Sequence, residues 1–243
     1  MRHRGLWLEV EEEIKKSFFL MIRRPTRTTQ SRSSAASDGY KRQKKSSINN
    51  EESSSLGDFI KKYEELTQKK KYGDYEELRK DFLSGFSAKG VVLEQMLYEI
   101  YVNRIDKIVF FDDVVPTLFD LKNKGYKLAL LTNTENLTFE KIEAKLKLSN
   151  YFDFLGLSYE IGEIKPNPKM FEAVVNHFGV KPSECLMVGD SLRSDITGAK
   201  NFGIPSVWIN RPKKSFDFAE IKPDFELSTL RDIDKVLEGL GNG

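Results

Sequence analysis

Two aspartates five residues apart follow a short apolar run and a glycine near the middle of the second half of the chain. Residues 185–188 have the length and composition of a buried strand, and Gly189 allows a tight turn where that strand ends. Asp190 and Asp195 then fall in the following loop and in the first turn of the next helix. Ligands bind at the carboxyl ends of strands in open α/β sheets, and paired carboxylates suit a hard cation such as Mg²⁺. A helix cap at Asp190 would explain its position equally well, so this stretch leaves both interpretations open.

Two other apolar runs also end in polar residues. Thr132 and Asn133 follow the run 127–131 and offer a hydroxyl group and backbone N–H groups near a helix start, which suit a phosphate oxygen. Lys165 lies in the loop 162–168, where two prolines restrict the backbone and start the next helix. A lysine held at the edge of a sheet can neutralise phosphate charge. Considered singly, Thr132 also fits a helix cap and Lys165 also fits a surface position.

The elements that must position these residues alternate between strand and helix from about residue 113 onward. Such alternation, with helices of about ten residues, predicts an α/β fold with a parallel sheet joined by right-handed crossovers. The predicted strands are 127–131, 152–157, 185–188, 205–209 and 225–227, and the predicted helices are 114–124, 137–146, 168–178, 196–202 and a last helix capped by Ser228.

The segment before this core is predicted to be all helical. Residues 48–55 read as a polar linker, and apolar residues then recur at helical spacing in three stretches, with an N-cap signal at Asp74. The aromatic residues of this segment fit a small core of their own, and some of them could also face a cleft.

Composition excludes several classes of protein. The 243-residue chain has a net charge of +2, yet residues 1–50 carry +7 and the remainder −5, so the globular part does not resemble a nucleic-acid binder. Cys185 is the single cysteine, which rules out an internal disulfide, and two histidines leave little scope for a histidine-based metal site. No run approaches the roughly 20 apolar residues of a membrane span. We expect a cytoplasmic monomer or homodimer with neither a nucleic-acid nor a membrane partner.

Residues 1–47 differ from the rest of the chain and have three interpretations. The apolar run 18–22 is too short for the hydrophobic region of a signal peptide. A transit peptide agrees better with the ten Lys and Arg of residues 15–47, but not with the four glutamates that precede them. The string from Ser17 to Gln43 resembles a translated sequencing-adapter sequence, which favours a non-native or disordered segment.

Three ordered motifs resemble the haloacid dehalogenase-like (HAD) hydrolase superfamily. Residues 130–133 (LLTN) look like its second motif, 162–171 (GEIKPNPKMF) like its third, and 189–199 like its fourth. The resemblance implies a doubly wound, Rossmann-like core over residues 107–243. It also implies a small helical cap over 48–106.

The family's chemistry, carried over by this resemblance, is phosphomonoester hydrolysis through an aspartyl phosphate. Thr132 would bind the transferring phosphoryl group, with Asn133 beside it. Lys165 would neutralise the phosphoryl group and orient the nucleophile. Asp190 would ligate Mg²⁺, and Asp195 would support the metal directly or through water. The substrate would be a small phosphorylated metabolite, whose identity the sequence does not reveal.

The chain departs from the family at the first motif, an Asp-x-Asp sequence after the central strand. No Asp-x-Asp precedes the helical segment, and Asp112-Asp113 has the wrong spacing and lies on the wrong side of it. We therefore expect the native gene to encode an Mg²⁺-dependent phosphatase and this chain to be nearly inactive. The alternative is a non-catalytic relative that binds a phosphorylated ligand or a protein partner. If residues 18–22 occupy the slot of the missing central strand, Arg23 is expected where the nucleophile belongs.

Overall fold

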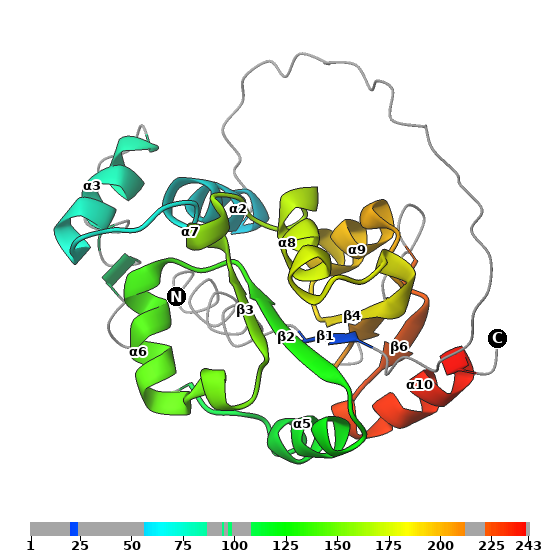
Figure 1. The fold of residues 1–243 in the computed structure, drawn as a ribbon. Coiled ribbons are helices and arrows are strands. Elements are labelled where there is room, and N and C mark those ends of the chain that lie inside the picture. The colour runs from blue at the N-terminus through cyan, green and yellow to red at the C-terminus, as the bar shows by residue number, and fades with distance from the viewer. Residues whose placement is uncertain are drawn as a thin grey trace, which may run out of the picture.

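The computed structural model of the chain describes residues 20–23, 56–86, 94, 97, 98, 108–211 and 222–241. Its centre is a six-stranded sheet with the strand order β3-β2-β1-β4-β5-β6 (Figure 1). In chain order the strands are β1 (Leu20–Arg23), β2 (Lys127–Thr132), β3 (Phe154–Leu157), β4 (Cys185–Gly189), β5 (Ser206–Ile209) and β6 (Phe225–Leu227). The predicted α/β fold is confirmed, and all five strands predicted from the sequence are present.

Helices cover both faces of the sheet and form a three-layer core. One face packs against α5 (Val114–Asn123), α6 (Asn136–Leu146) and α10 (Ile233–Gly241), and the other against α8 (Pro168–Phe178) and α9 (Thr197–Phe202) (Figure 1). The side chains of β2 alternate between these layers: Leu128 and Leu130 belong to the first cluster, and Ala129 and Leu131 to the second. Burial on both faces explains why the inner strands read as continuous apolar runs.

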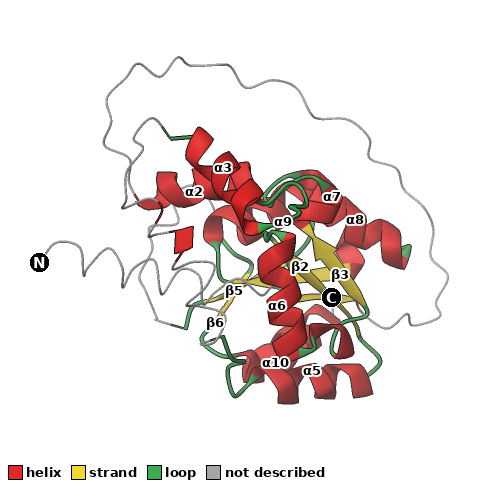
Figure 2. Ribbon diagram, turned by 90° about the vertical axis from the view of Figure 1, so that its left-hand side faces the viewer, coloured by secondary structure: helices red, strands yellow, loops and turns green. Residues whose placement is uncertain are grey.

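A pair of helices, α2 (Leu56–Thr67) and α3 (Tyr75–Ser84), lies beside the core (Figure 2). Asp74 caps α3 as predicted, because its carboxylate accepts a hydrogen bond from the Glu77 N–H group. The two helices have a hydrophobic cluster of their own, formed by Tyr63, Tyr72, Leu78, Phe82 and Leu97. The third predicted helix falls mostly outside the described residues, and the division into a cap (48–106) and a core (107–243) stays a prediction.

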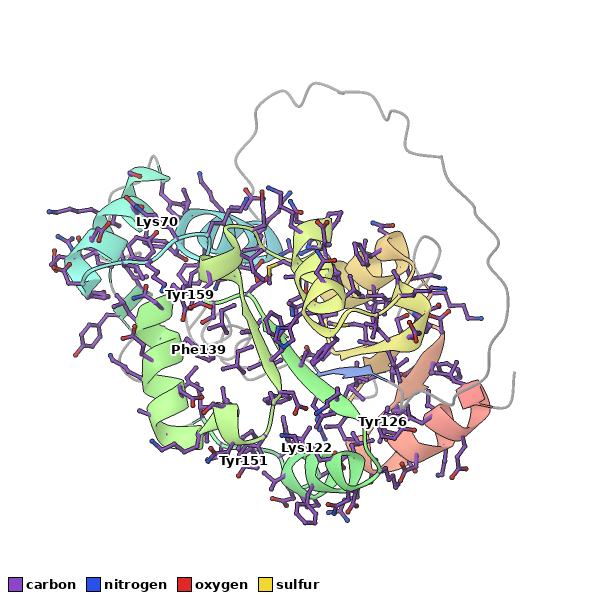
Figure 3. All side chains as sticks on the ribbon, viewed as in Figure 1. Lys70, Lys122, Tyr126, Phe139, Tyr151 and Tyr159 are labelled. Atoms are coloured by element: carbon purple, nitrogen blue, oxygen red, sulfur yellow. The ribbon has the colours of Figure 1, made fainter. Side chains whose placement is uncertain are left out.

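Buried polar contacts join the helical pair to the core. The Asn136 side chain accepts a hydrogen bond from the Tyr72 N–H group at 2.8 Å and donates one to the Tyr72 carbonyl at 3.0 Å. Ser158, the first residue of the short helix α7 (Ser158–Ile161), donates its hydroxyl to the Gln68 carbonyl at 2.6 Å. Tyr159 lies next to Phe139 of α6, at 6.4 Å between ring centroids (Figure 3). The helical pair is therefore docked on the end of the sheet through specific contacts.

The central strand β1 runs antiparallel to both of its neighbours. Leu20 pairs with Leu130 and Val188, and Arg23 pairs with Lys127 and Cys185. The other strand pairs, β2 with β3, β4 with β5 and β5 with β6, are parallel.

The position and direction of β1 bear on two expectations from the sequence. Leu20–Arg23 fill the central slot and overlap the segment 18–22 that was expected there. The expectation that Arg23 would stand at the nucleophile's position is wrong, because Arg23 lies at the edge where β2 and β4 begin. The backbone groups of the two flanking strands can bond a strand of either direction, so the predicted fully parallel sheet does not hold at β1.

Smaller differences concern the ends of elements. The last helical segment is capped by Thr229 and not by Ser228, since the Thr229 hydroxyl accepts from the Arg231 N–H group before the 3₁₀ turn Leu230–Asp232. A π-helical turn, η5 (Leu192–Ile196), precedes α9 and extends the predicted helix 196–202 toward Asp190. Within the described ranges, no helix combines the length and the apolar character needed to cross a bilayer.

Candidate functional site

Lys165 and Asp195, which lie 30 residues apart in the chain, meet at the end of the sheet. The Lys165 Nζ atom lies 3.0 Å from Asp195 Oδ1, and neither side chain is exposed to solvent. Lys165 comes from the loop between α7 and α8, whereas Asp195 comes from η5, which follows β4. Because β2 and β4 are separated only by β1, residues that follow their carboxyl ends share one edge of the sheet. This arrangement is consistent with the sequence analysis, which placed polar residues at the ends of these strands.

The Lys165 side chain is fixed beside Thr132. Its ammonium group donates a hydrogen bond to the Leu131 carbonyl at 2.6 Å. The Asn133 amide holds the Lys165 backbone from both sides: its Oδ1 accepts from the Lys165 N–H group at 2.7 Å, and its Nδ2 donates to the Lys165 carbonyl at 3.2 Å. Thr132 ends β2 and is 2% exposed. Three predicted site residues, Thr132, Asn133 and Lys165, are thus adjacent.

Asp195 is held as firmly as its partner. Its Oδ2 atom accepts a hydrogen bond from the Ser191 N–H group at 2.9 Å. A Cβ atom built at Gly189 would lie only 2.5 Å from Asp195 Oδ2. Gly189 is therefore needed because Asp195 packs directly against the backbone at the end of β4. The sequence suggested a tight turn at this glycine, and the close approach of Asp195 is the physical reason that the structure gives.

Burial opposes the charge on both members of the pair. Burial lowers the pKa of Lys165, and the nearby Asp195 carboxylate partly counteracts that effect. Burial likewise raises the pKa of Asp195, against the effects of the Lys165 ammonium group and the Ser191 N–H group. Each charge is therefore maintained by the other, and removal of one partner leaves the second uncompensated.

Asp190 occupies the loop directly after β4. Its carbonyl accepts a hydrogen bond from the indole Nε1 of Trp208, a 3% exposed residue of β5, at 2.9 Å. The Asp190 carboxylate is close enough to raise the pKa of Lys165. Asp190 therefore adjoins the pair formed by Lys165 and Asp195, where a cation or phosphate ligand was predicted.

The described residues do not make a complete magnesium site. Both Asp195 oxygens already have partners, Lys165 on one side and the Ser191 N–H group on the other. In the part of the chain that the structure describes, no three side chains of the His, Cys, Asp or Glu type gather as a metal-binding group. Asp190 supplies one carboxylate, whereas Mg²⁺ requires an octahedral shell of oxygens.

Asp113 belongs to a separate structural cluster. Asp113 is 5% exposed, and its carboxylate accepts two hydrogen bonds from the Arg211 guanidinium at 2.9 Å, one from the Thr229 hydroxyl at 2.6 Å and one from the Leu230 N–H group at 2.8 Å. These contacts connect the start of α5 to the segments that follow β5 and β6. They agree with the interpretation that Asp112-Asp113 is not a displaced first motif.

Two site residues, Glu64 and Arg193, were not predicted from the sequence. Glu64 of α2 forms an ion pair with Arg193 of η5, at 3.1 Å between Oε2 and NH2, and its carboxylate lies near the Asn133 amide, which lowers its pKa. Burial raises the pKa of Glu64 to about 7, against the opposing charges of Arg193 and Lys165. No sequence signal marks Glu64, because a glutamate in an amphipathic helix is ordinarily a solvated residue.

A family model described as haloacid dehalogenase-like hydrolase matches residues 12–203. The chain belongs to this family. The match covers the strands β1 to β4 and all of the site residues, and it agrees with the resemblance drawn from the three motifs.

Several curated proteins to which the chain is similar are named as phosphatases. The chain is 38% identical over 125 residues to a glyceraldehyde 3-phosphate phosphatase of Pyrococcus furiosus, covering 50% of this chain and 52% of the relative. It is 32% identical over 138 residues to a phosphoserine phosphatase of Thermus thermophilus, covering 56% of this chain and 55% of the relative. The chain therefore spans about half the length of these relatives.

Solved structures support the same fold. A HAD phosphatase from Thermococcus onnurineus matches with a TM-score of 0.55 and 30% identity, over 76% of this chain and 80% of that chain. The HAD-hydrolase YfnB from Bacillus subtilis, described as bound to magnesium, matches with a TM-score of 0.53 and 25% identity, over 66% of this chain and 68% of that chain. The HAD fold and membership of the haloacid dehalogenase-like hydrolase family are thereby established for the chain.

Proposed function

We propose that the chain derives from an Mg²⁺-dependent phosphomonoesterase acting on a small phosphorylated metabolite, and that in its present form it binds such phosphate esters but hydrolyses them very slowly. The observation that carries this proposal is the combination of an intact Thr132–Asn133–Lys165–Asp195 arrangement with a central strand that brings no carboxylate to it. The names of the curated phosphatases support the substrate class.

The phosphate-binding half of the proposal rests on charge and hydrogen bonding. The Lys165 ammonium group is bound to Asp195 and the Leu131 carbonyl and is removed from solvent, so its attraction for a phosphoryl oxygen would be stronger than that of a surface lysine. Thr132 would supply a hydroxyl donor and Asn133 holds Lys165 in place. Asp195 acts on the ligand through Lys165, as a positioning residue.

Magnesium dependence is proposed for the native enzyme. Asp190 is the residue that we propose as a metal ligand, with Asp195 supporting the site from behind. The HAD-hydrolase YfnB is described as bound to magnesium, which supports magnesium as the choice of metal. Mg²⁺ usually keeps several water molecules as ligands, and these would fill much of its shell beside Asp190.

The expected lack of turnover follows from the central strand. The family's nucleophile is implied at the carboxyl end of a strand placed between β2 and β4, and here β1 has the sequence LMIR and points its Arg23 end toward the opposite edge. No aspartate occurs before Asp38 in the sequence. The interpretation of residues 1–47 as a translated adapter would account for this loss, and it stays a hypothesis.

A second candidate function is favoured by the same strand. β1 completes the hydrogen bonding of the sheet without an acidic residue, as a natural non-catalytic relative would require. Resequencing the 5′ end of the gene separates the two: an Asp-x-Asp sequence there supports the enzyme, and a genuine genomic copy of residues 15–47 supports the non-catalytic protein. A cytoplasmic location and a monomeric or homodimeric state stay predictions under either function.

Isothermal titration of the chain with inorganic phosphate tests the proposed phosphate site. We expect Thr132→Val to weaken binding about tenfold and the paired change K165M/D195N, which removes both buried charges together, to weaken it more strongly. Lys169→Met is the matched control, because the Lys169 side chain is 66% exposed. Equal phosphate affinity in the paired variant and in Lys169→Met would contradict the proposal.

A further inference from the structure

Glu64 lies near the two loops that follow β2 and β4. It reaches Asn133, which follows β2, and Arg193, which follows β4, so it bridges the two loops that flank the central strand. Glu64 is positioned by α2, because the neighbouring residues Tyr63 and Thr67 are buried on the same side of that helix. A ligand with its phosphate group among Thr132, Asn133 and Lys165 would have the rest of its structure next to this carboxylate.

The Glu64 carboxylate is largely removed from solvent, with a side-chain exposure of 19%. It is electrostatically linked to Arg193, Lys165 and Asp195. Its ion pair with Arg193 is not by itself a strong structural reason for the residue, because the Arg193 side chain is 50% exposed and pairs of this kind contribute little to stability. A partly desolvated carboxylate beside a phosphate site has a clear effect on a ligand, since its charge is only weakly screened there.

We propose that Glu64 is a specificity-determining residue that favours phosphate esters whose alcohol part carries an ammonium or hydroxyl donor and disfavours those that carry a second anion. This inference rests on the proposed phosphate site and deepens it. A donor group two carbons from the phosphate ester oxygen can approach Glu64, whereas a carboxylate in the same place meets a like charge.

Arg193 strengthens the expected effect of Glu64. In the present arrangement Glu64 neutralises the Arg193 guanidinium, which would otherwise attract an anionic group. Loss of the Glu64 charge should therefore weaken the binding of an ammonium group. It should also strengthen the binding of a carboxylate, because Arg193 is then no longer neutralised. The change in preference should be larger than the simple loss of one contact.

The test uses three esters that share a phosphate group and a two-carbon skeleton: 2-aminoethyl phosphate, 2-hydroxyethyl phosphate and carboxymethyl phosphate. Their affinities for the full chain are measured by isothermal titration at pH 8 and constant ionic strength. At this pH Glu64 is mostly ionised, because its pKa is about 7. Inorganic phosphate serves as the common reference.

We expect the unaltered chain to bind the amino ester about tenfold more tightly than the carboxy ester. Glu64→Gln should reduce that ratio to within about twofold, and Glu64→Lys should reverse it. Glu65→Gln is the matched control, since it removes the same charge from an exposed position on the same helix and should leave the ratio unchanged. Urea midpoints and circular dichroism spectra of the Glu64 variants that match those of the unaltered chain show that the variants remain folded.

The outcomes separate this inference from the proposed function. If all three esters and inorganic phosphate fail to bind, both the phosphate site and the role of Glu64 are overturned. If the esters bind but Glu64→Gln keeps the tenfold ratio, or Glu65→Gln changes it as much, the role of Glu64 alone is overturned.

Discussion

The Lys165 ammonium group and the Asp195 carboxylate lie 3.0 Å apart with no exposure of either side chain, at the point where β2 and β4 end. Burial opposes the charge of both groups, and each is maintained by the other. The pair therefore links the stability of the core to the chemistry of the site.

Removal of one charge from this pair should be costly. Asp195→Asn leaves Lys165 buried without an anionic partner, and we expect a loss of about 3–5 kcal/mol in the free energy of unfolding. Urea denaturation followed by circular dichroism measures the loss. Asp232→Asn is the control, because Asp232 pairs with Lys235 at an exposed position and should change stability by less than about 1 kcal/mol. Similar losses in the two variants would contradict a buried, mutually dependent pair.

Gly189 should not tolerate even one additional methyl group. In Gly189→Ala the new Cβ atom would lie 2.5 Å from Asp195 Oδ2, so the Asp195 side chain or the end of β4 must shift. We expect a loss of about 1–3 kcal/mol in stability together with weaker phosphate binding.

The control for this prediction is a glycine without such a neighbour. A methyl group added at Gly239 of α10 would have no atom within 4 Å, so Gly239→Ala should be neutral or stabilising by up to about 1 kcal/mol. If the urea midpoints of Gly189→Ala and Gly239→Ala shift in the same direction by the same amount, there is no tight contact at Gly189.

Asp113 should make the fold sensitive to acid. Burial raises the pKa of this carboxyl group, but the hydrogen bonds from Arg211, Thr229 and Leu230 outweigh burial and bring the pKa down to about 2. Because the folded-state pKa lies below the ordinary value of 3.8, the contribution of Asp113 is present above about pH 4 and is lost as the pH falls toward 2. The contribution amounts to about 2 kcal/mol.

Chemical denaturation at a series of pH values between 6 and 2 checks this contribution. Asp113→Asn should lower stability at pH 6 and flatten the decline below pH 4. Asp112→Asn, a change at the adjacent exposed position, should leave the pH profile as it is. A profile that is identical in the chain and in Asp113→Asn would show that this carboxyl group does not titrate as described.

Asn136 should hold the helical pair on the core. Its buried amide makes two hydrogen bonds with the Tyr72 backbone, and Asn136→Ala leaves the Tyr72 N–H and carbonyl groups without them. We expect a local cost of about 1–3 kcal/mol. Hydrogen exchange should become faster in residues 56–86 while β2 and β4 keep their protection. Faster exchange throughout the sheet would contradict a local role.

Most of the core could be predicted from the residues alone, whereas the candidate site residues were grouped through the family resemblance. Apolar runs buried on both faces, such as 185–188, identify inner strands, and polar residues at their ends identify the functional edge. Thr132, Asn133 and Lys165 could be grouped because their motifs occur in a fixed order. The contacts between them, such as the Asn133 amide on the Lys165 backbone, depend on loop geometry that residue types do not specify.

The direction of β1 could not be predicted from the sequence. A short apolar strand satisfies the backbone groups of its neighbours in either direction, so Leu20–Arg23 carries no signal that distinguishes parallel from antiparallel pairing. Glu64 was not predicted for a different reason. Its role depends on where α2 docks, and docking is decided by contacts between residues far apart in the chain, such as Tyr72 with Asn136.

The most direct test of the central claim is the rate of phosphomonoester hydrolysis by the chain in the presence of Mg²⁺, measured with p-nitrophenyl phosphate beside the K165M/D195N variant. We predict a rate no higher than that of the variant, since β1 brings no nucleophile to the site. A robust Mg²⁺-dependent rate in the chain that disappears in the variant would contradict the claim.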